Sequence, residues 1–273
     1  MKWQHKTNQN NQVNQATYRR GSFLVALRAE MMKSRHGTPV KLACALTLPF
    51  LLMATLMTVR APELGLQYSP WNYWYALLMP VSITLVATTI AKADARLGNR
   101  AILSSGMPLE RIWVAKCTWC LILSLVSNLI VFVIYTVLSL VLPQGAASLP
   151  SMFATALALT LVSSWIIPAT LFLTMRVGTL SGIFIPLAAQ LLLSFSWSLV
   201  PLWPVCPPTA TIVLPTAFLP VLPTGEPASD GLALVESIAQ TGNVVLALIV
   251  AGVVTALIAV AGAAWLARSE ELR

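Results

Sequence analysis

The sequence predicts an all-α polytopic membrane protein with six transmembrane helices, and three observations support this fold class. The chain is 57% hydrophobic and 10% charged, whereas soluble domains contain about 25% charged residues. Six apolar stretches are long enough to cross a bilayer. All but one of the 17 Lys and Arg residues fall on one predicted side of the membrane. Lipid must therefore solvate part of the surface of this protein.

Two elements precede the predicted membrane domain. Residues 1–18 are polar and rich in Asn and Gln, which predicts a disordered tail. Residues 19–39 predict an amphipathic helix that lies in the membrane interface and turns at residues 37–39 into the first span. Its apolar flank comprises Phe23, Leu24, Leu27 and Met31, whereas Arg28, Glu30, Lys33 and Arg35 lie on its other faces.

Residues 40–268 form the predicted membrane domain, and residues 269–273 follow it as a cytoplasmic tail. A helix needs roughly 20 mainly apolar residues to cross the hydrocarbon core. The expected spans cover about residues 40–59, 74–91, 113–141, 151–174, 178–200 and 243–266. Only a turn near residues 175–178 separates the fourth span from the fifth, so that boundary is the least distinct.

The positive charges predict the orientation of the spans. If the N-terminus is cytoplasmic, Arg60 is the only Lys or Arg residue that falls outside the cell. Short cytoplasmic loops carry such an excess of Lys and Arg. The net charge of +8 is therefore a topology signal, and a nucleic-acid partner is not expected. Both termini are predicted to be cytoplasmic.

The interiors of the expected spans carry no charge. Away from their ends they contain no Asp, Glu, Lys, Arg or His, although an ion-coupled carrier usually needs such groups. No catalytic or metal-binding set is present either, and Cys117 and Cys120 are expected to be packed thiols. The most polar span residues are Asn128 and Gln190. They are expected to bond neighbouring helices or to line a substrate path.

Two exterior features are unusual. Trp71, Tyr73 and Trp74 crowd the start of the second span, as an interfacial aromatic belt or as a rim that contacts a peptide. Residues 201–242 are apolar but repeatedly interrupted by proline, which predicts short re-entrant or surface-lying pieces. Asp230 is expected to cap a small helix with Leu232, Val235 and Ile238 on one side. The acidic residues of this exterior segment are Glu226, Asp230 and Glu236.

Residues 92–111, which we name the coupling loop, join the second and third spans. Lys92, Arg96 and Arg100 share one helical face and repel each other, so they favour an anionic neighbour. That neighbour is either the lipid headgroups or an acidic groove on a cytoplasmic protein. A tight turn and Pro108 follow, which makes a rigid knob suited to receive force from such a partner. The expected contact residues are Lys92, Asp94, Arg96, Leu97, Arg100, Ile102 and Leu103.

Taken together, these elements resemble the ABC-2-type export permeases. More narrowly, residues 71–116 are similar to the permease subunits of lantibiotic-immunity ABC transporters. The residues that fill the family pattern are Arg100, Leu103, Ser104, Pro108, Trp113 and Lys116. The Asn/Gln-rich N-terminus and the proline density of residues 201–227 depart from that pattern, and they leave open which of the two paired permeases this chain is.

The resemblance implies a complex in a bacterial plasma membrane. This chain and a second, different six-span permease would be driven by a homodimeric cytoplasmic ATPase, and they would expel a cationic lantibiotic and so confer immunity. ATP and Mg²⁺ would bind the ATPase, since this chain has no phosphate-binding loop and is expected to hold no cofactor of its own. The residues expected along the peptide path are Trp71, Tyr73, Trp74, Asn128, Gln190, Glu226, Asp230 and Glu236. The alternatives are export of a lipid, glycan or drug, or a membrane scaffold or sensor that transports nothing.

Overall fold

The computed structural model describes residues 22–35, 37–60, 68–95, 107–141, 147–199, 202–229 and 231–271. Within these ranges the chain is helical apart from turns and one isolated bridge between Val221 and Pro227. The all-α prediction is therefore confirmed for the part of the chain that the structure describes.

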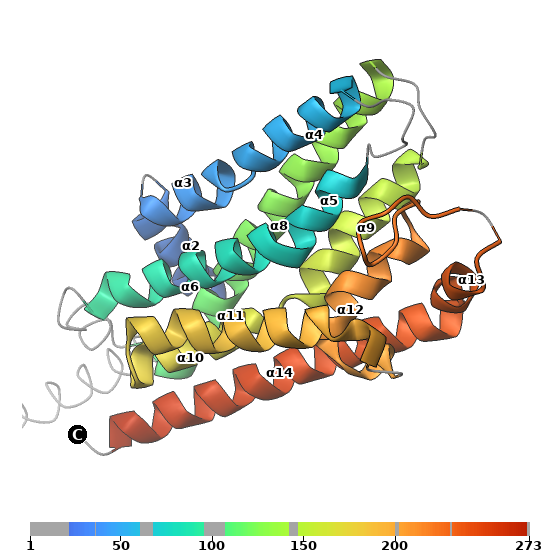
Figure 1. Ribbon diagram of the computed structural model, residues 1–273. Coiled ribbons are helices and arrows are strands. Elements are labelled where there is room, and N and C mark those ends of the chain that lie inside the picture. Colours follow the sequence, from blue (N-terminus) through green and yellow to red (C-terminus); the bar gives the residue numbers. More distant parts are fainter. Residues whose placement is uncertain are drawn as a thin grey trace, which may run out of the picture.

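The helices follow one another as a series of long segments with a few short ones between them (Figure 1). The first half contains α2 (Phe23–Ser34), α3 (Thr38–Ala45), α4 (Leu48–Arg60), α5 (Ser69–Tyr73), a π-helical turn (Trp74–Leu78), α6 (Met79–Ala95) and α8 (Leu109–Val141). The second half contains α9 (Leu149–Val162), α10 (Ile166–Arg176), α11 (Thr179–Phe195), α12 (Pro207–Val213), α13 (Ala233–Ala239) and α14 (Thr241–Glu271). Three 3₁₀ turns flank α12 at Trp197–Leu199, Trp203–Val205 and Leu214–Ala217.

Four segments are long and apolar enough to cross a membrane, which indicates a membrane-embedded protein. They are Ser69–Ala93, Leu109–Leu138, Leu149–Arg176 and Thr241–Arg268, and they match the second, third, fourth and sixth expected spans. The fifth expected span is the apolar helix α11, whose 17 residues are at the short limit for crossing. The first consists of α3 and α4 with a turn between them. A count of six spans therefore stays a prediction.

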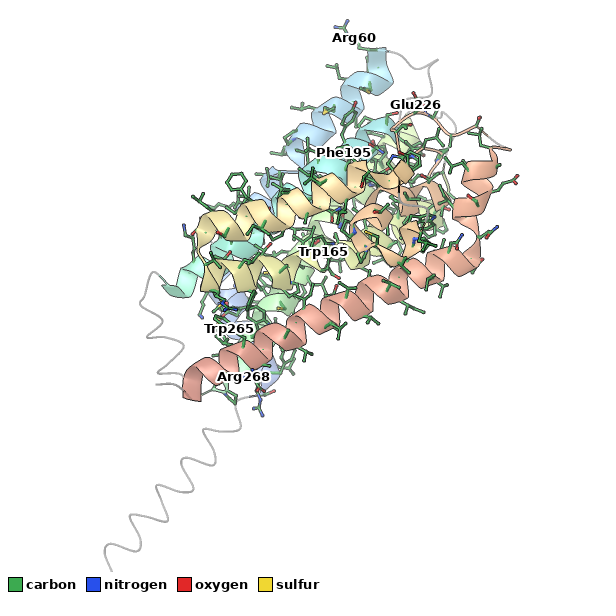
Figure 2. All side chains as sticks on the ribbon, turned by 60° about the horizontal axis from the view of Figure 1, so that its bottom comes forward. Arg60, Trp165, Phe195, Glu226, Trp265 and Arg268 are labelled. Atoms are coloured by element: carbon green, nitrogen blue, oxygen red, sulfur yellow. The ribbon has the colours of Figure 1, made fainter. Side chains whose placement is uncertain are left out.

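Basic residues gather at one end of the bundle. Successive long segments run in alternating directions, and α8 contacts α2, α3, α6, α9 and α14 (Figure 1). In Figure 2 Arg268 and Trp265 lie at one end and Arg60 and Glu226 at the opposite end. We name the first of these the basic end. Besides Arg268, it carries Lys92 at the end of α6, Arg111 and Lys116 near the start of α8, and Arg176 at the end of α10.

A helix, α2, occupies part of the range expected for the N-terminal amphipathic helix, but it does not bury the expected apolar flank. The face of α2 that packs on α8 carries Ala26, Glu30 and Ser34, all of them buried. Leu24 and Met31 of the apolar flank are exposed. Small side chains let two helices approach closely, whereas an outward apolar flank suits contact with lipid. The position of α2 in a membrane interface stays a prediction.

The proline-rich exterior segment folds back into the protein. Every residue of α12 is buried, and this helix packs among α9, α11 and α14. Ser194 Oγ and Gln190 Nε2 donate to the carbonyl oxygen of Pro208 at 2.7 and 3.2 Å. Irregular backbone is tolerated at membrane depth only where protein or a wet cavity covers it, so this burial supports the re-entrant interpretation over the surface-lying one.

A short helix, α13, occupies part of the predicted exterior segment, and its exterior position stays a prediction. The residue at the N-cap position is Leu232, which makes no side-chain capping hydrogen bond. Asp230 precedes this position and lies outside the described residues. Of the three apolar residues expected on one side of the helix, Ile238 is buried and Leu232 is exposed.

Gly262 allows α14 to approach α8, which predicts a local steric effect of substitution. A Cβ atom added at Gly262 would overlap the indole of Trp113, whose Nε1 donates to the carbonyl oxygen of Ala259 at 2.9 Å. Gly252, on the same helix, has nothing within 4 Å of an added Cβ. We expect Gly262→Ala to destabilise the protein by about 1–3 kcal/mol through overpacking. Gly252→Ala should be neutral or stabilising by up to about 1 kcal/mol.

Melting temperatures of the two purified variants in the same detergent test this difference. We expect Gly262→Ala to melt below the wild type and Gly252→Ala at or above it. Equal melting temperatures for the two variants would show that α14 does not pack on Trp113.

Candidate functional site: a buried ion cluster at the basic end

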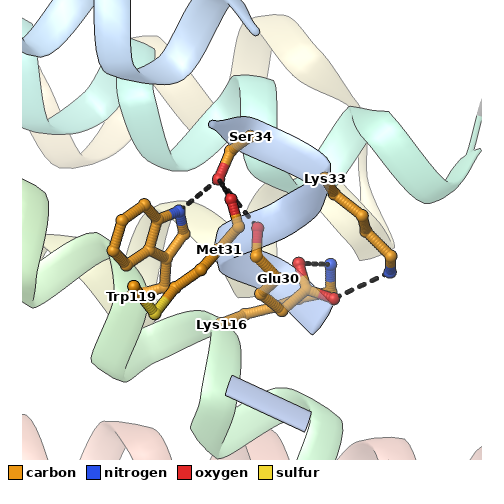
Figure 3. A network of polar contacts seen from close by, with 6 residues as sticks. All are labelled: Glu30, Met31, Lys33, Ser34, Lys116 and Trp119. Carbon is orange, nitrogen blue, oxygen red and sulfur yellow. Dashed lines mark hydrogen bonds and ion pairs between the residues drawn. The ribbon is translucent and has the colours of Figure 1, made fainter. Parts of the chain in front are cut away.

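A cluster of charged and polar side chains joins α2 to α8 at the basic end (Figure 3). Lys116 Nζ lies 3.1 Å from Glu30 Oε2, and Lys33 Nζ lies 2.8 Å from Glu30 Oε1. One turn further along α2, Ser34 Oγ accepts a hydrogen bond from Trp119 Nε1 and donates to the carbonyl oxygen of Glu30. We name these five residues the ion cluster.

Helical periodicity explains how the two helices meet. Glu30 and Ser34 are four residues apart on α2, and Lys116 and Trp119 are three apart on α8, so each pair occupies one face. Glu30 is 4% exposed and Lys116 is 1% exposed. A buried carboxylate or ammonium costs several kcal/mol unless it is paired and hydrogen-bonded. The contact between Glu30 and Lys116 therefore fixes how α2 sits on α8.

A cavity of about 220 Å³ adjoins the ion cluster. Its wall carries two ammonium groups and one carboxylate, so the lining is net positive. The charged and hydroxyl-bearing lining residues are Glu30, Lys33, Ser34, Thr38, Thr89 and Lys92, contributed by α2, α3 and α6. Lys92 connects this cavity to the coupling loop, because it stands in the last turn of α6.

The structure describes only part of the coupling loop. Lys92 is half-buried, and Asp94 belongs to α6. The remaining expected contact residues, Arg96, Leu97, Arg100, Ile102 and Leu103, lie outside the described residues. The helices on either side of the loop border this region, since α6 lines the cavity and α8 supplies Lys116 to the ion cluster.

The aromatic residues at the start of the second expected span are mainly core residues. Trp71 and Trp74 are 1% and 0% exposed, whereas Tyr73 is 47% exposed. The Trp71 ring stacks on Tyr135 of α8, with 4.6 Å between their centroids. Trp71 and Trp74 are therefore core residues in this structure, and Tyr73 is the member of the three whose side chain is exposed. That any of the three contacts a peptide stays a prediction.

The two polar span residues make the interhelical bonds expected of them. Asn128 accepts from Trp74 Nε1 at 2.9 Å and donates to Thr160 Oγ1 at 3.0 Å, which joins three segments. Gln190 Nε2 donates to the carbonyl oxygen of Pro208 in α12 at 3.2 Å and to Ser194 Oγ of its own helix at 2.7 Å, and its Oε1 has no hydrogen-bond partner among the described residues. These bonds supply the polar contacts that hold apolar helices in register.

Asn72 anchors the exterior segment, a role that the sequence did not indicate. Its Nδ2 donates to the carbonyl oxygen of Pro223 at 3.1 Å and to Tyr75 Oη at 3.0 Å. Gly225 lies directly over the Asn72 side chain with φ of +90°, a conformation that L side chains rarely adopt. Nearby, the backbone N–H of Ala147 donates to Tyr68 Oη at 3.0 Å, and burial raises the pKa of the Tyr68 phenol.

Loss of the Asn72 side chain is expected to open the exterior segment locally. Asn72→Ala should raise hydrogen–deuterium exchange in residues 219–229, because both side-chain bonds are lost and a neutral hydrogen bond contributes about 0.5–1.5 kcal/mol. Tyr73→Ala, one residue further along and exposed, is the matched control and should leave exchange unchanged. Unchanged exchange in both variants would show that other contacts hold the segment.

Of the exterior acidic residues, the structure describes Glu226 and Glu236, whereas Asp230 lies outside the described residues. Glu226 and Glu236 are exposed, and Glu226 lies at the end opposite Arg268 (Figure 2). No group of three potential metal ligands occurs among the described residues. Cys117 and Cys120 are thiols that take part in no disulfide.

The sequence patterns did not predict the ion cluster. The sequence pattern gives Lys116 a place only in the family resemblance and Glu30 a place only among the charges off the apolar flank of residues 19–39. A usable signal was present in the stripe of Ala26, Glu30 and Ser34, where a carboxylate stands between two small residues at helical spacing. Such a stripe favours close helix packing, and a buried carboxylate then requires a cationic partner. No protein-family model, curated protein or solved structure matches this chain.

Proposed function

We propose that this chain is the transmembrane permease subunit of an ABC-2-type exporter that expels a lantibiotic-type peptide and confers immunity. The observation that carries the proposal is the position of buried charge. Among the described residues, the only charged side chains in the buried class are Glu30 and Lys116, and both belong to the basic end. Deeper inside, the described part of the bundle buries no carboxylate, ammonium or imidazole, which are the groups that usually bind a driving ion or relay its protons.

The depth of Lys116 supports this interpretation. It is seven residues beyond Leu109, the first residue of α8, which corresponds to about 10 Å of a helix that rises 1.5 Å per residue. Coupling-ion sites of secondary transporters lie near the bilayer midplane instead. This depth supports a role for the ion cluster in transmitting force rather than in relaying ions.

The ion cluster also gives the coupling loop a mechanical connection. In the proposed complex the cytoplasmic ATPase homodimer binds ATP and Mg²⁺ and pushes on the loop between α6 and α8. Movement of α8 then carries α2 with it, because separating Glu30 from Lys116 would break a buried ion pair. Lys92 brings α6 to the same cavity.

The remaining features fit a heteromeric exporter. In the most apolar stretch of α14 only 11% of the residues are buried, so another protein or lipid must cover this helix. A second six-span permease is the partner that the family resemblance implies. A cationic peptide suits the exposed carboxylates of Glu226 and Glu236 at the opposite end. In this proposal both termini are cytoplasmic and the membrane is a bacterial plasma membrane.

Resistance of a sensitive bacterial host tests the proposal. The chain is expressed together with the ATPase and the second permease encoded beside it, and the cells are challenged with a panel of purified lantibiotics. We expect protection against at least one peptide, and loss of protection when the ATP-binding lysine of the ATPase is replaced. An assembled complex that protects against none would point to another cargo. Failure of any ATPase to co-purify would favour the scaffold or sensor.

A further inference from the structure

A second cavity opens between α10 and α14 at the basic end. It has a volume of about 370 Å³, and its lining includes Phe172, Arg176, Leu257, Ile258, Ala261 and Trp265. These side chains are apolar except for one guanidinium and one indole N–H. In Figure 2 the labelled Trp265 lies near Arg268 at this end.

The walls of this cavity are firmly packed. The Phe172 and Trp265 rings meet edge to face, with 5.2 Å between centroids and 81° between planes. Leu257, on the rim, is 65% exposed. The cavity therefore opens sideways onto the exposed apolar surface of α14, where hydrocarbon would surround a membrane-embedded bundle.

Arg176 places a positive charge at the mouth of this cavity. It is the last residue of α10, and its Cζ lies 5.7 Å from the centroid of the Phe172 ring. The side chain is exposed, and no carboxylate among the described residues pairs with it. A guanidinium held over an aromatic ring keeps its donors available, and its planar fork matches the oxygen atoms of a phosphate.

We infer that this cavity is a binding site for an anionic phospholipid. The acyl chain lies along Leu257, Ile258 and Trp265, and the phosphate is bound by Arg176. Basic pockets between membrane helices bind anionic headgroups in this way. A cationic peptide would be repelled by Arg176, and an apolar helix of another subunit would leave the guanidinium without a counter-charge. The inference does not depend on the proposed cargo.

Quenching of tryptophan fluorescence by brominated lipids tests this site, because Trp265 lines the cavity. The full chain is reconstituted in phosphatidylcholine vesicles that contain increasing fractions of phosphatidylglycerol with brominated acyl chains. Brominated phosphatidylcholine serves as the reference lipid. The difference between the wild type and Trp265→Phe isolates the signal of Trp265. We expect half-quenching of this signal at about a fivefold lower fraction of phosphatidylglycerol than of phosphatidylcholine.

A pair of arginine variants distinguishes lipid binding at this cavity from attraction of anionic lipid to the basic surface in general. Arg176→Gln should remove the fivefold preference, whereas Arg268→Gln, which changes a basic residue of the same end outside the cavity lining, should keep it. Ala261→Phe fills the cavity with Arg176 in place, and it should abolish quenching of Trp265 by both lipids. Equal preference in the wild type and Arg176→Gln would overturn the inference. So would equal losses in the two arginine variants, or the absence of Trp265 quenching in the wild type.

Discussion

Lys116→Met is expected to destabilise the protein by about 3–5 kcal/mol, which is the usual cost of leaving one member of a buried ion pair without its partner. Glu30 is 4% exposed, so its carboxylate cannot recover full hydration when Lys116 is absent. Lys33 remains 2.8 Å from Glu30 Oε1, but its own side chain is 38% exposed, so solvent screens this second contact. The melting temperature of the purified variant in detergent measures the loss.

A second substitution distinguishes the ion pair from simple packing. The double variant Glu30→Gln with Lys116→Met should recover much of the lost stability, since neither buried charge then remains. Lys33→Met, at the more exposed contact of the cluster, is the matched single control and should cost about 0–1 kcal/mol. If Lys116→Met proves no more harmful than Lys33→Met, the ion cluster does not hold α2 on α8.

Charge reversal in the coupling loop has the largest expected effect on function. The variant with Arg96→Glu and Arg100→Glu should reduce co-purification of the ATPase by more than tenfold and abolish resistance, because like charges across an interface cost several kcal/mol. Arg60→Glu, which reverses a charge at the opposite end, should change neither quantity. The melting temperature of each variant is measured in parallel, so that lost binding is separated from lost folding.

An unchanged phenotype would overturn the proposed role of this loop. If cells that carry the Arg96→Glu and Arg100→Glu variant resist the peptide as well as the wild type does, the lipid headgroups are the better explanation for the basic stripe. If resistance is lost while the ATPase still binds, the loop transmits force from the ATPase and is not needed to dock it.

The runs of apolar residues predict most of the long helices, because an apolar helix is stable both against lipid and against other apolar helices. The third expected span, residues 113–141, corresponds to α8 (Leu109–Val141), which extends its start by about one turn. The first expected span is interrupted because Pro49 has no N–H to donate to the carbonyl of residue 45, and α3 ends at Ala45. The helix therefore breaks just before Pro49, and α4 begins at Leu48.

The ion cluster was harder to predict because its members come from distant parts of the chain. Eighty-six positions separate Glu30 from Lys116, and nothing local indicates that α2 packs on α8 through its small-residue face. For Asn128 the kind of contact was predictable, since a polar side chain among apolar helices must find a partner. Its particular partners, Trp74 and Thr160, depend on how three segments pack.

The central claim is that the work of transport enters through a soluble ATPase at the basic end. Its most direct test is the release of a fluorescent lantibiotic from vesicles that contain the purified permeases, with and without the ATPase, ATP and Mg²⁺. The account predicts ATP-dependent release only when the ATPase is present. Release of the peptide by the permeases alone, at the same rate as with ATP and the ATPase, would contradict it.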